Sequence, residues 1–148
     1  MTTSNQFALL DSNILIYALD STSVYHFEAR SLREEALKDK IQACVCPQVL
    51  MEFFAVITNS RKVKTPLTPQ KAREEVEKYL KATNILKIYP SDDILERMLF
   101  LLKKYEIKGV QVFDLQLVAT MLANGITRIY TYNQSDFAKF GEIEAITP

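Results

Sequence analysis

The sequence predicts an α/β protein, a three-layer α/β/α sandwich built on a central, mostly parallel sheet. Short apolar runs alternate along the chain with longer segments whose apolar residues recur at helical spacing. Strands that alternate with helices are joined by crossover connections, which makes them parallel within one sheet. The 148 residues contain no repeat, low-complexity tract or linker, so a single domain over residues 1–148 is expected.

The first half of the chain contains two predicted strands and three predicted helices. In order, these are a strand at 7–10, helices at 13–19 and 24–40, a strand at 41–46 and a helix from 47 to about 57. The charged residues of the second helix indicate a solvent-facing side, and Phe27, Ala36 and Leu37 are expected to face the core. Pro47 suits the first turn of the third helix.

The second half continues the alternation. In order, we expect a helix at 69–82, a strand at 86–89, helices at 92–105 and 114–123, and strands at 126–132 and 143–146. Thr68 is a predicted N-cap followed by Pro69, Ser91 is a second predicted N-cap, and Asn124-Gly125 is a typical helix end. The helix after Ser91 is strongly amphipathic, with apolar residues at helical spacing: Ile94, Leu95, Met98, Leu99, Leu102 and Tyr105.

Composition excludes several function classes. The formal net charge is +0, from 18 basic and 18 acidic residues, so any nucleic-acid contact depends on a local basic patch. Three glycines, without a GxGxxG or GxxxxGK[ST] motif, argue against a glycine-rich nucleotide loop. A single histidine, His26, argues against a structural zinc site and is interpreted as a surface or helix-packing residue.

Several features favour a reducing, cytoplasmic location. Cys44 and Cys46 lie on one predicted strand, where a disulfide between them has poor geometry, so two buried thiols are expected. Residues 1–6 lack the basic and apolar regions of a signal peptide. No apolar run is long enough to span a bilayer, so we expect a cytoplasmic protein without a membrane partner.

Glu52 carries a charge within an otherwise apolar segment, Val49 to Ile57. A carboxylate removed from water must become neutral, form a pair or bind a cation, because its desolvation is costly. Glu52 could also lie at a helix edge in contact with solvent, or pair with a lysine. Its role therefore depends on the other acids of the chain.

Three further acids are expected to lie near Glu52. Asp11 ends the first predicted strand, Asp136 follows the strand at 126–132, and Asp114 begins a helix after a loop. Ligand sites in parallel sheets lie outside the carboxyl ends of the strands, where Glu52 can also point. Each aspartate could instead be a simple turn or helix-terminal residue. Four converging carboxylates would repel one another, which predicts a divalent cation, and an all-oxygen site favours Mg²⁺ or Mn²⁺ over zinc.

Four motifs carry a resemblance to the PIN domain: LLDSNILIYA, VLMEFFAVIT, VFDLQLVATMLANGI and YTYNQSDF. They are especially similar to the VapC-type toxin ribonucleases of bacterial toxin–antitoxin pairs, over almost the whole chain. The resemblance implies a parallel sheet flanked by helices, and a Mg²⁺- or Mn²⁺-dependent ribonuclease that cleaves RNA phosphodiester bonds with metal-activated water. It also implies products with a 5′-phosphate and a 3′-hydroxyl.

The resemblance also implies which residues form the site. It assigns Asp11 and Asp114 as the most direct metal ligands, with Glu52 and Asp136 completing the catalytic acids. Four polar residues would support them: Ser12, Asn13, Thr131 and Asn133. Asn13 could equally be a helix cap, and Thr131 an ordinary strand residue.

Two basic clusters and two partners complete the expectations. Arg61, Lys62 and Lys64 could contact the RNA backbone, as could a second cluster of Lys103, Lys104 and Lys108, although either could be a solvated surface turn. The resemblance suggests a homodimer and a short antitoxin protein that blocks the site. Whether the protein is a toxin or a housekeeping nuclease stays open.

Rival classes lack specific residues. A haloacid-dehalogenase phosphatase needs an acid two positions after its nucleophile, where this chain has Asn13. A response-regulator receiver needs an aspartate at the end of its third strand, which the strand at 86–89 does not provide. The remaining alternative is a non-catalytic PIN-fold module that binds RNA or a protein. Four mutually repelling carboxylates argue against it.

Overall fold

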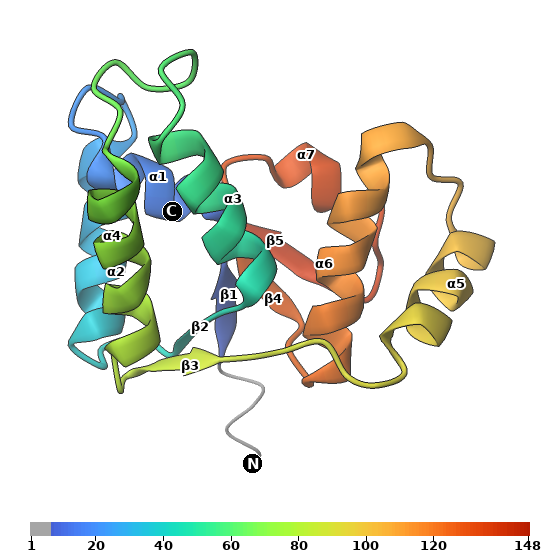
Figure 1. Cartoon of the computed structure of the whole chain (residues 1–148). Helices are drawn as coiled ribbons and strands as arrows, with labels where there is room; N and C mark the ends of the chain where they lie inside the picture. Colours follow the sequence, from blue (N-terminus) through green and yellow to red (C-terminus); the bar gives the residue numbers. More distant parts are fainter. Residues whose placement is uncertain (1–6) are drawn as a thin grey trace.

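Five short strands form the centre of the fold, which a computed structural model describes for residues 7–148 (Figure 1). The strands are β1 (Ala8–Leu10), β2 (Ala43–Val45), β3 (Ile85–Lys87), β4 (Arg128–Tyr130) and β5 (Glu144–Ile146). The helices are α1 (Ser12–Leu19), α2 (His26–Leu37), α3 (Pro47–Ile57), α4 (Pro69–Lys81), α5 (Ile94–Lys104), the 3₁₀ turn η2 (Gly109–Gln111), α6 (Val112–Ala123) and α7 (Gln134–Phe137). The prediction for residues 1–6 lies outside the described residues.

The sheet has the order β3-β2-β1-β4-β5, and all four strand pairings are parallel. Right-handed crossovers place the helices before β2 and before β3 on one face, and those between β3 and β4 on the other. Figure 1 accordingly shows α1 to α4 gathered on one side of the strands, and α5 and α6 on the other. The predicted α/β/α sandwich is confirmed. The direction of chain travel reverses between β1 and β4, and a crevice forms at such a reversal.

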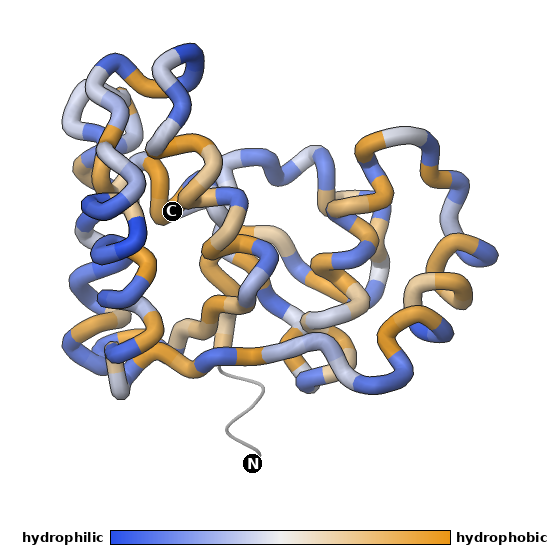
Figure 2. Tube along the Cα trace, in the orientation of Figure 1, coloured by the Kyte–Doolittle hydropathy of each residue, from blue (hydrophilic) through white to orange (hydrophobic). Residues whose placement is uncertain are grey.

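The core lies between the sheet and its two helix layers. The strands carry buried aliphatic residues, and Phe53 of α3 and Leu115 of α6 are fully enclosed on the helix side. Figure 2 shows the apolar segments concentrated around the strands, and hydrophilic residues along the outer helices. Cys44 and Cys46 are both buried and free, as the sequence predicts.

Local signals in the sequence locate several helix ends correctly. Thr68 Oγ1 accepts a hydrogen bond from the backbone N–H of Lys71 at 3.2 Å, so Thr68 caps α4, and Pro69 occupies its first position. Gly125 follows α6 with φ +70°, a conformation that favours glycine at a helix end.

Two predictions about helix detail are wrong. Phe27 is 79% exposed instead of facing the core, because α2 buries Ala29, Leu32 and Ala36 on its other side. Ser91 does not cap α5, since the helix starts after Asp93 without a side-chain cap.

Helix α5 is also less buried than its amphipathic pattern suggests. Leu101 is its one fully buried residue, whereas Leu95, Leu99 and Phe100 are 57–65% exposed. The helix packs against α6 at the margin of the fold and has no second layer to cover its other apolar positions. Over residues 7–148, no helix has the length and apolar character needed to cross a membrane.

The capping difference between Thr68 and Ser91 gives a stability prediction. Thr68→Ala removes a helix cap and should lower the free energy of unfolding by about 1 kcal/mol. Ser91→Ala removes a hydroxyl that donates to Asp93 and satisfies no helix N–H, so its effect should stay below about 0.5 kcal/mol. Urea unfolding followed by circular dichroism measures both. Equal losses would contradict the assignment of the cap.

Candidate functional site

Asp11 lies at the carboxyl end of β1 and is only 6% exposed. It is the N-cap of α1: its Oδ1 accepts a hydrogen bond from the backbone N–H of Ser12 at 2.7 Å. Its Oδ2 accepts one from Thr131 Oγ1 at 2.7 Å and a longer one from Asn13 Nδ2 at 3.4 Å. Burial raises the pKa of Asp11, whereas the hydrogen bonds from Thr131 and Ser12 lower it and the charge of Glu52 raises it. The carboxylate is therefore held in one orientation by neighbouring donors.

Asn13 and Thr131 tie α1 to the segment that follows β4. Asn13 Nδ2 donates to Thr131 Oγ1 at 3.2 Å, and Asn13 Oδ1 accepts from the backbone N–H of Tyr132 at 3.2 Å. Thr131 Oγ1 also accepts from the backbone N–H of Asn133 at 3.0 Å. Asn13 and Thr131 are both buried. Of the four predicted supporting residues, Asn133 takes part through its backbone, and its side chain is exposed.

Glu52 reaches the same place from α3. Its Oε2 accepts a hydrogen bond from Ser12 Oγ at 3.1 Å, and its Oε1 accepts one from Gln48 Nε2 at 3.3 Å. Among the ion pairs of residues 7–148, none involves Glu52, so the alternative that it pairs with a lysine is not observed. Glu52 is half-buried, however, and Met51 beside it is 55% exposed, so α3 is not enclosed on all sides.

Gln48 is a site residue that the sequence interpretation missed. Besides contacting Glu52, its Nε2 donates to the backbone carbonyl of Phe113 at 2.8 Å and so joins α3 to the first turn of α6. The available signal was its position four residues before Glu52, which places both side chains on the same face of a helix.

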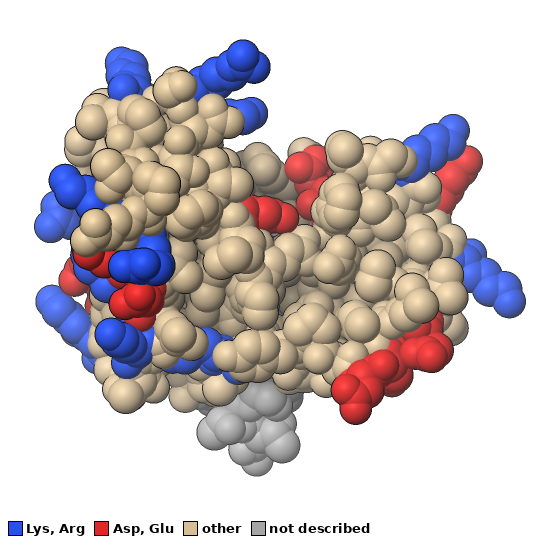
Figure 3. Space-filling model, viewed as in Figure 1, with Lys and Arg blue, Asp and Glu red and all other residues tan. Residues whose placement is uncertain are grey.

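Asp114 shows that the four acids share one electrostatic environment. It lies in the first turn of α6, and its pKa is raised to about 6. Partial burial is the largest cause, followed by the negative charges of Asp136, Asp11 and Glu52. Lys139 opposes them, but not enough to cancel the rise. In Figure 3, acidic side chains occupy the hollow between the two groups of helices.

The chemistry of this donor set fits a hard divalent cation, although the acids do not form a closed cage. No group of three or more Asp, Glu, His or Cys side chains within residues 7–148 is arranged to hold a metal ion as it stands. The donors are all oxygens, and Mg²⁺ typically uses only one or two protein carboxylates and retains several waters. The uncompensated charge around Asp114 supplies the attraction.

The predicted basic residues lie outside the hydrogen-bonded site. Arg61, Lys62 and Lys64 are exposed on the loop after α3. Lys104 pairs with Glu142 at 2.9 Å, away from the four acids. Lys139 is the basic residue whose charge acts on Asp114, and the sequence interpretation missed it. Its position three residues after Asp136 was the available signal.

The parallel sheet and the acids at the carboxyl ends of its strands define a class: α/β domains with a carboxylate-lined crevice at the reversal point of the sheet. The family model described as PIN domain matches residues 8–143, and the chain belongs to this family. The resemblance expected from the four motifs is therefore confirmed.

Individual relatives agree with this assignment. The chain is 25% identical to Ribonuclease VapC48 of Mycobacterium tuberculosis over 138 residues, which cover 93% of this chain and 94% of the relative. Among solved structures, VapC20 of Mycobacterium tuberculosis, described as a sarcin-ricin loop cleaving toxin, has a TM-score of 0.66 at 17% identity, covering 92% of this chain and 98% of that one. VapBC2 from Rickettsia felis, bound to a DNA fragment from its promoter, has the same TM-score and identity, covering 96% and 98%. At 17% identity, these two structures support the assignment of the fold alone.

The raised pKa of Asp114 gives a prediction about stability and pH. A carboxyl whose pKa is higher in the folded than in the unfolded state binds its proton more tightly when folded. Stability is therefore lost as the pH rises from 3.8 to about 6. Without divalent cations, Asp114→Asn should raise the free energy of unfolding at neutral pH by on the order of 1 kcal/mol, allowing for partial exposure.

Urea unfolding in EDTA at several pH values measures this gain, which should shrink toward pH 3.8. The matched control is Asp92→Asn, which neutralises an exposed acid and should leave stability almost unchanged. A gain for Asp114→Asn that does not depend on pH would contradict the electrostatic cause.

Proposed function

We propose that this protein is a divalent-cation-dependent endoribonuclease that hydrolyses RNA phosphodiester bonds, and that it acts as the toxin of a toxin–antitoxin pair. The observation that carries the proposal is the acidic crevice, where burial and then the charges of Asp136, Asp11 and Glu52 raise the pKa of Asp114. A site with this uncompensated negative charge attracts a cation. Membership of the PIN domain family and the ribonuclease name of VapC48 support the nuclease assignment.

Asp11 and Asp114 are the residues that we expect to hold Mg²⁺ or Mn²⁺, with Glu52 and Asp136 completing the negative site. Such a cation, when bound, activates water and offsets charge that develops on the phosphate. The chain's own residues provide the orientation. Thr131 and Asn13 hold the Asp11 carboxylate, while the hydroxyl of Ser12 and the amide of Gln48 hold Glu52.

RNA must approach this acidic site with its negative backbone. Arg61, Lys62 and Lys64 are exposed on the loop after α3, and we propose that they contact phosphates beyond the cleavage point. The loop lies next to the end of α1, because a hollow there is lined by residues of both segments, among them Asp20 and Val63. Lys139 offers a further positive charge beside Asp114.

A specific observation favours a second candidate, a PIN-fold module that binds RNA or a protein without cleaving it. No three acids within the described part of the chain are arranged as a ready-made metal ligand group. Binding without a cation would, however, leave the charges around Asp114 uncompensated. Cleavage measurements separate the two candidates.

Cleavage of RNA by the purified protein should require Mg²⁺ or Mn²⁺ and stop in EDTA. Asp11→Asn and Asp114→Asn should each reduce the rate at least about 100-fold, since loss of residues that merely support metal ligands already costs 10–100-fold. The control Asp92→Asn should retain the wild-type rate. Undiminished cleavage in EDTA or by Asp11→Asn would refute the proposed chemistry, and RNA binding without cleavage would favour the second candidate.

We further propose a protein antitoxin that covers the crevice. VapBC2 from Rickettsia felis is among the solved structures with the same fold. Expression of the chain alone in bacteria should then arrest growth, and Asp11→Asn should relieve the arrest. Growth unaffected by the wild-type chain would argue for a housekeeping nuclease.

A homodimer is the oligomeric state that we propose, with α5 in the interface. Leu95, Leu99 and Leu102 recur at helical spacing and remain exposed, and Phe100 borders an adjacent hollow on α6. Exposed apolar surface of this kind is typical of an association site.

Leu99→Asp should convert the dimer to a monomer, because it places a charge within an apolar interface. Size-exclusion chromatography with light scattering measures the mass at several concentrations. Leu80→Asp, on the exposed side of α4, is the matched control and should leave the dimer intact. A wild-type protein that is monomeric at all concentrations would contradict the proposal.

A further inference from the structure

Three tyrosines form one aromatic cluster beside the acidic crevice: Tyr17, Tyr25 and Tyr132. The rings of Tyr25 and Tyr132 are stacked, with centroids 4.4 Å apart and planes inclined by 30°. Tyr17 contacts both, at 5.2 Å from Tyr25 and 5.4 Å from Tyr132. Tyr25 is 43% exposed, whereas Tyr17 and Tyr132 are half-buried. The cluster thus presents one exposed ring supported by two others.

The cluster is joined to Asp11 through Tyr132. The backbone N–H of Tyr132 donates to Asn13 Oδ1 at 3.2 Å, and the amide of Asn13 contacts both Asp11 and Thr131. The ring that supports Tyr25 therefore belongs to a residue fixed by the hydrogen-bond network that holds the Asp11 carboxylate.

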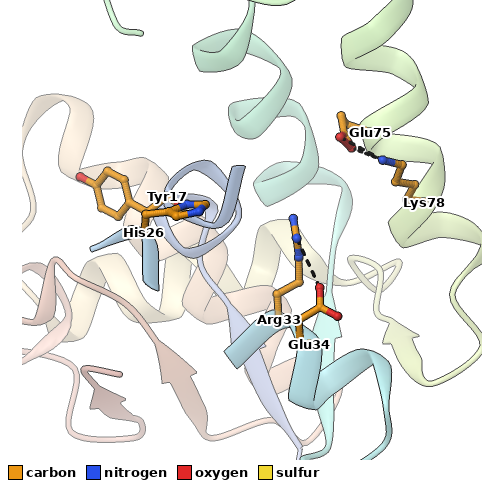
Figure 4. A network of polar contacts seen from close by, with 6 residues as sticks. All are labelled: Tyr17, His26, Arg33, Glu34, Glu75 and Lys78. Carbon is orange, nitrogen blue, oxygen red and sulfur yellow. Dashed lines mark hydrogen bonds and ion pairs between the residues drawn. The ribbon is translucent and has the colours of Figure 1, made fainter. Parts of the chain in front are cut away.

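A second connection runs through the junction of α1 and α2. Tyr17 lies four residues after Asn13, one turn further along the same face of α1. His26 Nδ1 donates to the carbonyl oxygen of Tyr17 at 2.8 Å, and Figure 4 shows both side chains at this junction. The backbone N–H of Tyr25 donates to Ser23 Oγ at 3.1 Å. These contacts connect the start of α2, beside Tyr25, to α1, which begins at the site.

The surroundings of the Tyr25 ring favour binding of an RNA base over binding of a phosphate. Burial, the acid Glu28 and the neighbouring tyrosines raise the pKa of Tyr132. The negative charge of Glu28 disfavours a phosphate here. Every RNA base has a π-face that stacks on an aromatic ring, and unpaired bases are the parts of RNA that proteins capture in this way.

We infer that Tyr25, supported by Tyr132 and Tyr17, is a binding subsite for one unpaired base of the RNA near the cleaved phosphate. The inference rests on the proposed ribonuclease function, because it is the link to Asp11 that places the ring beside the reaction. The alternative occupant is a protein, since Val24 and Phe27, which flank Tyr25, are 85% and 79% exposed. A docking surface of that kind would depend on all three exposed residues, whereas a base subsite depends on the stacked ring.

The test compares Tyr25→Leu, which keeps an apolar side chain but removes the aromatic face, with Tyr25→Phe, which keeps the face. Phe27→Leu is the matched control, because Phe27 is an exposed aromatic outside the stack. The probe is a fluorescent unstructured RNA of ~10 nucleotides. An abasic strand of the same length and the probe paired as a duplex serve as comparison ligands. Binding is measured by anisotropy in Ca²⁺, and cleavage is measured separately in Mg²⁺.

Tyr25→Leu should weaken binding of the unpaired RNA by about 5-fold to 100-fold, the range that one stacked base provides. KM should rise by a similar factor, with kcat within about threefold of wild type, because the ring does not touch the reacting atoms. Tyr25→Phe and Phe27→Leu should bind like wild type. The abasic strand and the duplex should be insensitive to Tyr25→Leu.

Wild-type affinity of Tyr25→Leu for the unpaired RNA would overturn the inference. An equal loss with Phe27→Leu, or with the abasic strand, would also overturn it and indicate a general apolar docking surface. Failure of the proposed function is recognised separately: RNA binding that depends on Tyr25, without any cleavage in Mg²⁺ or Mn²⁺, would refute the nuclease and leave the base subsite in place. RNA binding undetectable in the wild type would refute the subsite itself.

Discussion

The buried carboxylate of Asp11 is the constraint on which the rest of the structure depends. A carboxylate with this little exposure is tolerated only when donors surround it. Its donors come from α1 and from the end of β4, so they meet only when β1 and β4 are paired in the observed register, Leu10 opposite Tyr130. The central strand pairing, the start of α1 and the polar segment after β4 therefore all satisfy a single charged group.

The fold also accommodates the mutual repulsion of the acids in the crevice. Gln48 contacts Glu52 and the carbonyl of Phe113, so a neutral amide links the two helices that carry Glu52 and Asp114. The raised pKa of Asp114 shows that its charged form is still disfavoured in the folded protein. Active sites commonly retain such a cost because the same charges are required for binding and chemistry.

Local chemistry explains which parts of the structure could be predicted from the sequence. The cap at Thr68, the helix end at Gly125 and the strand-end position of Asp11 each follow from one residue and its immediate neighbours. The convergence of the four acids could be predicted because parallel strands bring their carboxyl ends to one edge, and the charges of the other three do act on Asp114.

Features that depend on tertiary packing could not be predicted in this way. Phe27 has an apolar side chain, but the side of α2 that meets the core is decided by its contact with α1. The exposed leucines of α5 follow an amphipathic pattern that does not say how much of the helix a neighbour covers. Gln48 and Lys139 each lie close in sequence to a site acid, but the contact of Gln48 with Phe113, 65 positions away, leaves no local pattern.

The hydrogen bond between Thr131 and Asp11 joins residues 120 positions apart and has a consequence for the order of folding. The contact between Ser12 and Glu52 spans only 40 positions, so it can form within the first half of the chain. During synthesis, the ribosome releases the N-terminal part first, and contacts of large sequence separation form late. A nascent chain thus carries Asp11 without the hydrogen bond from Thr131 until β4 has emerged and paired with β1. The acidic crevice is therefore completed only when β4 and the segment after it, which carries Asp136, have joined the sheet.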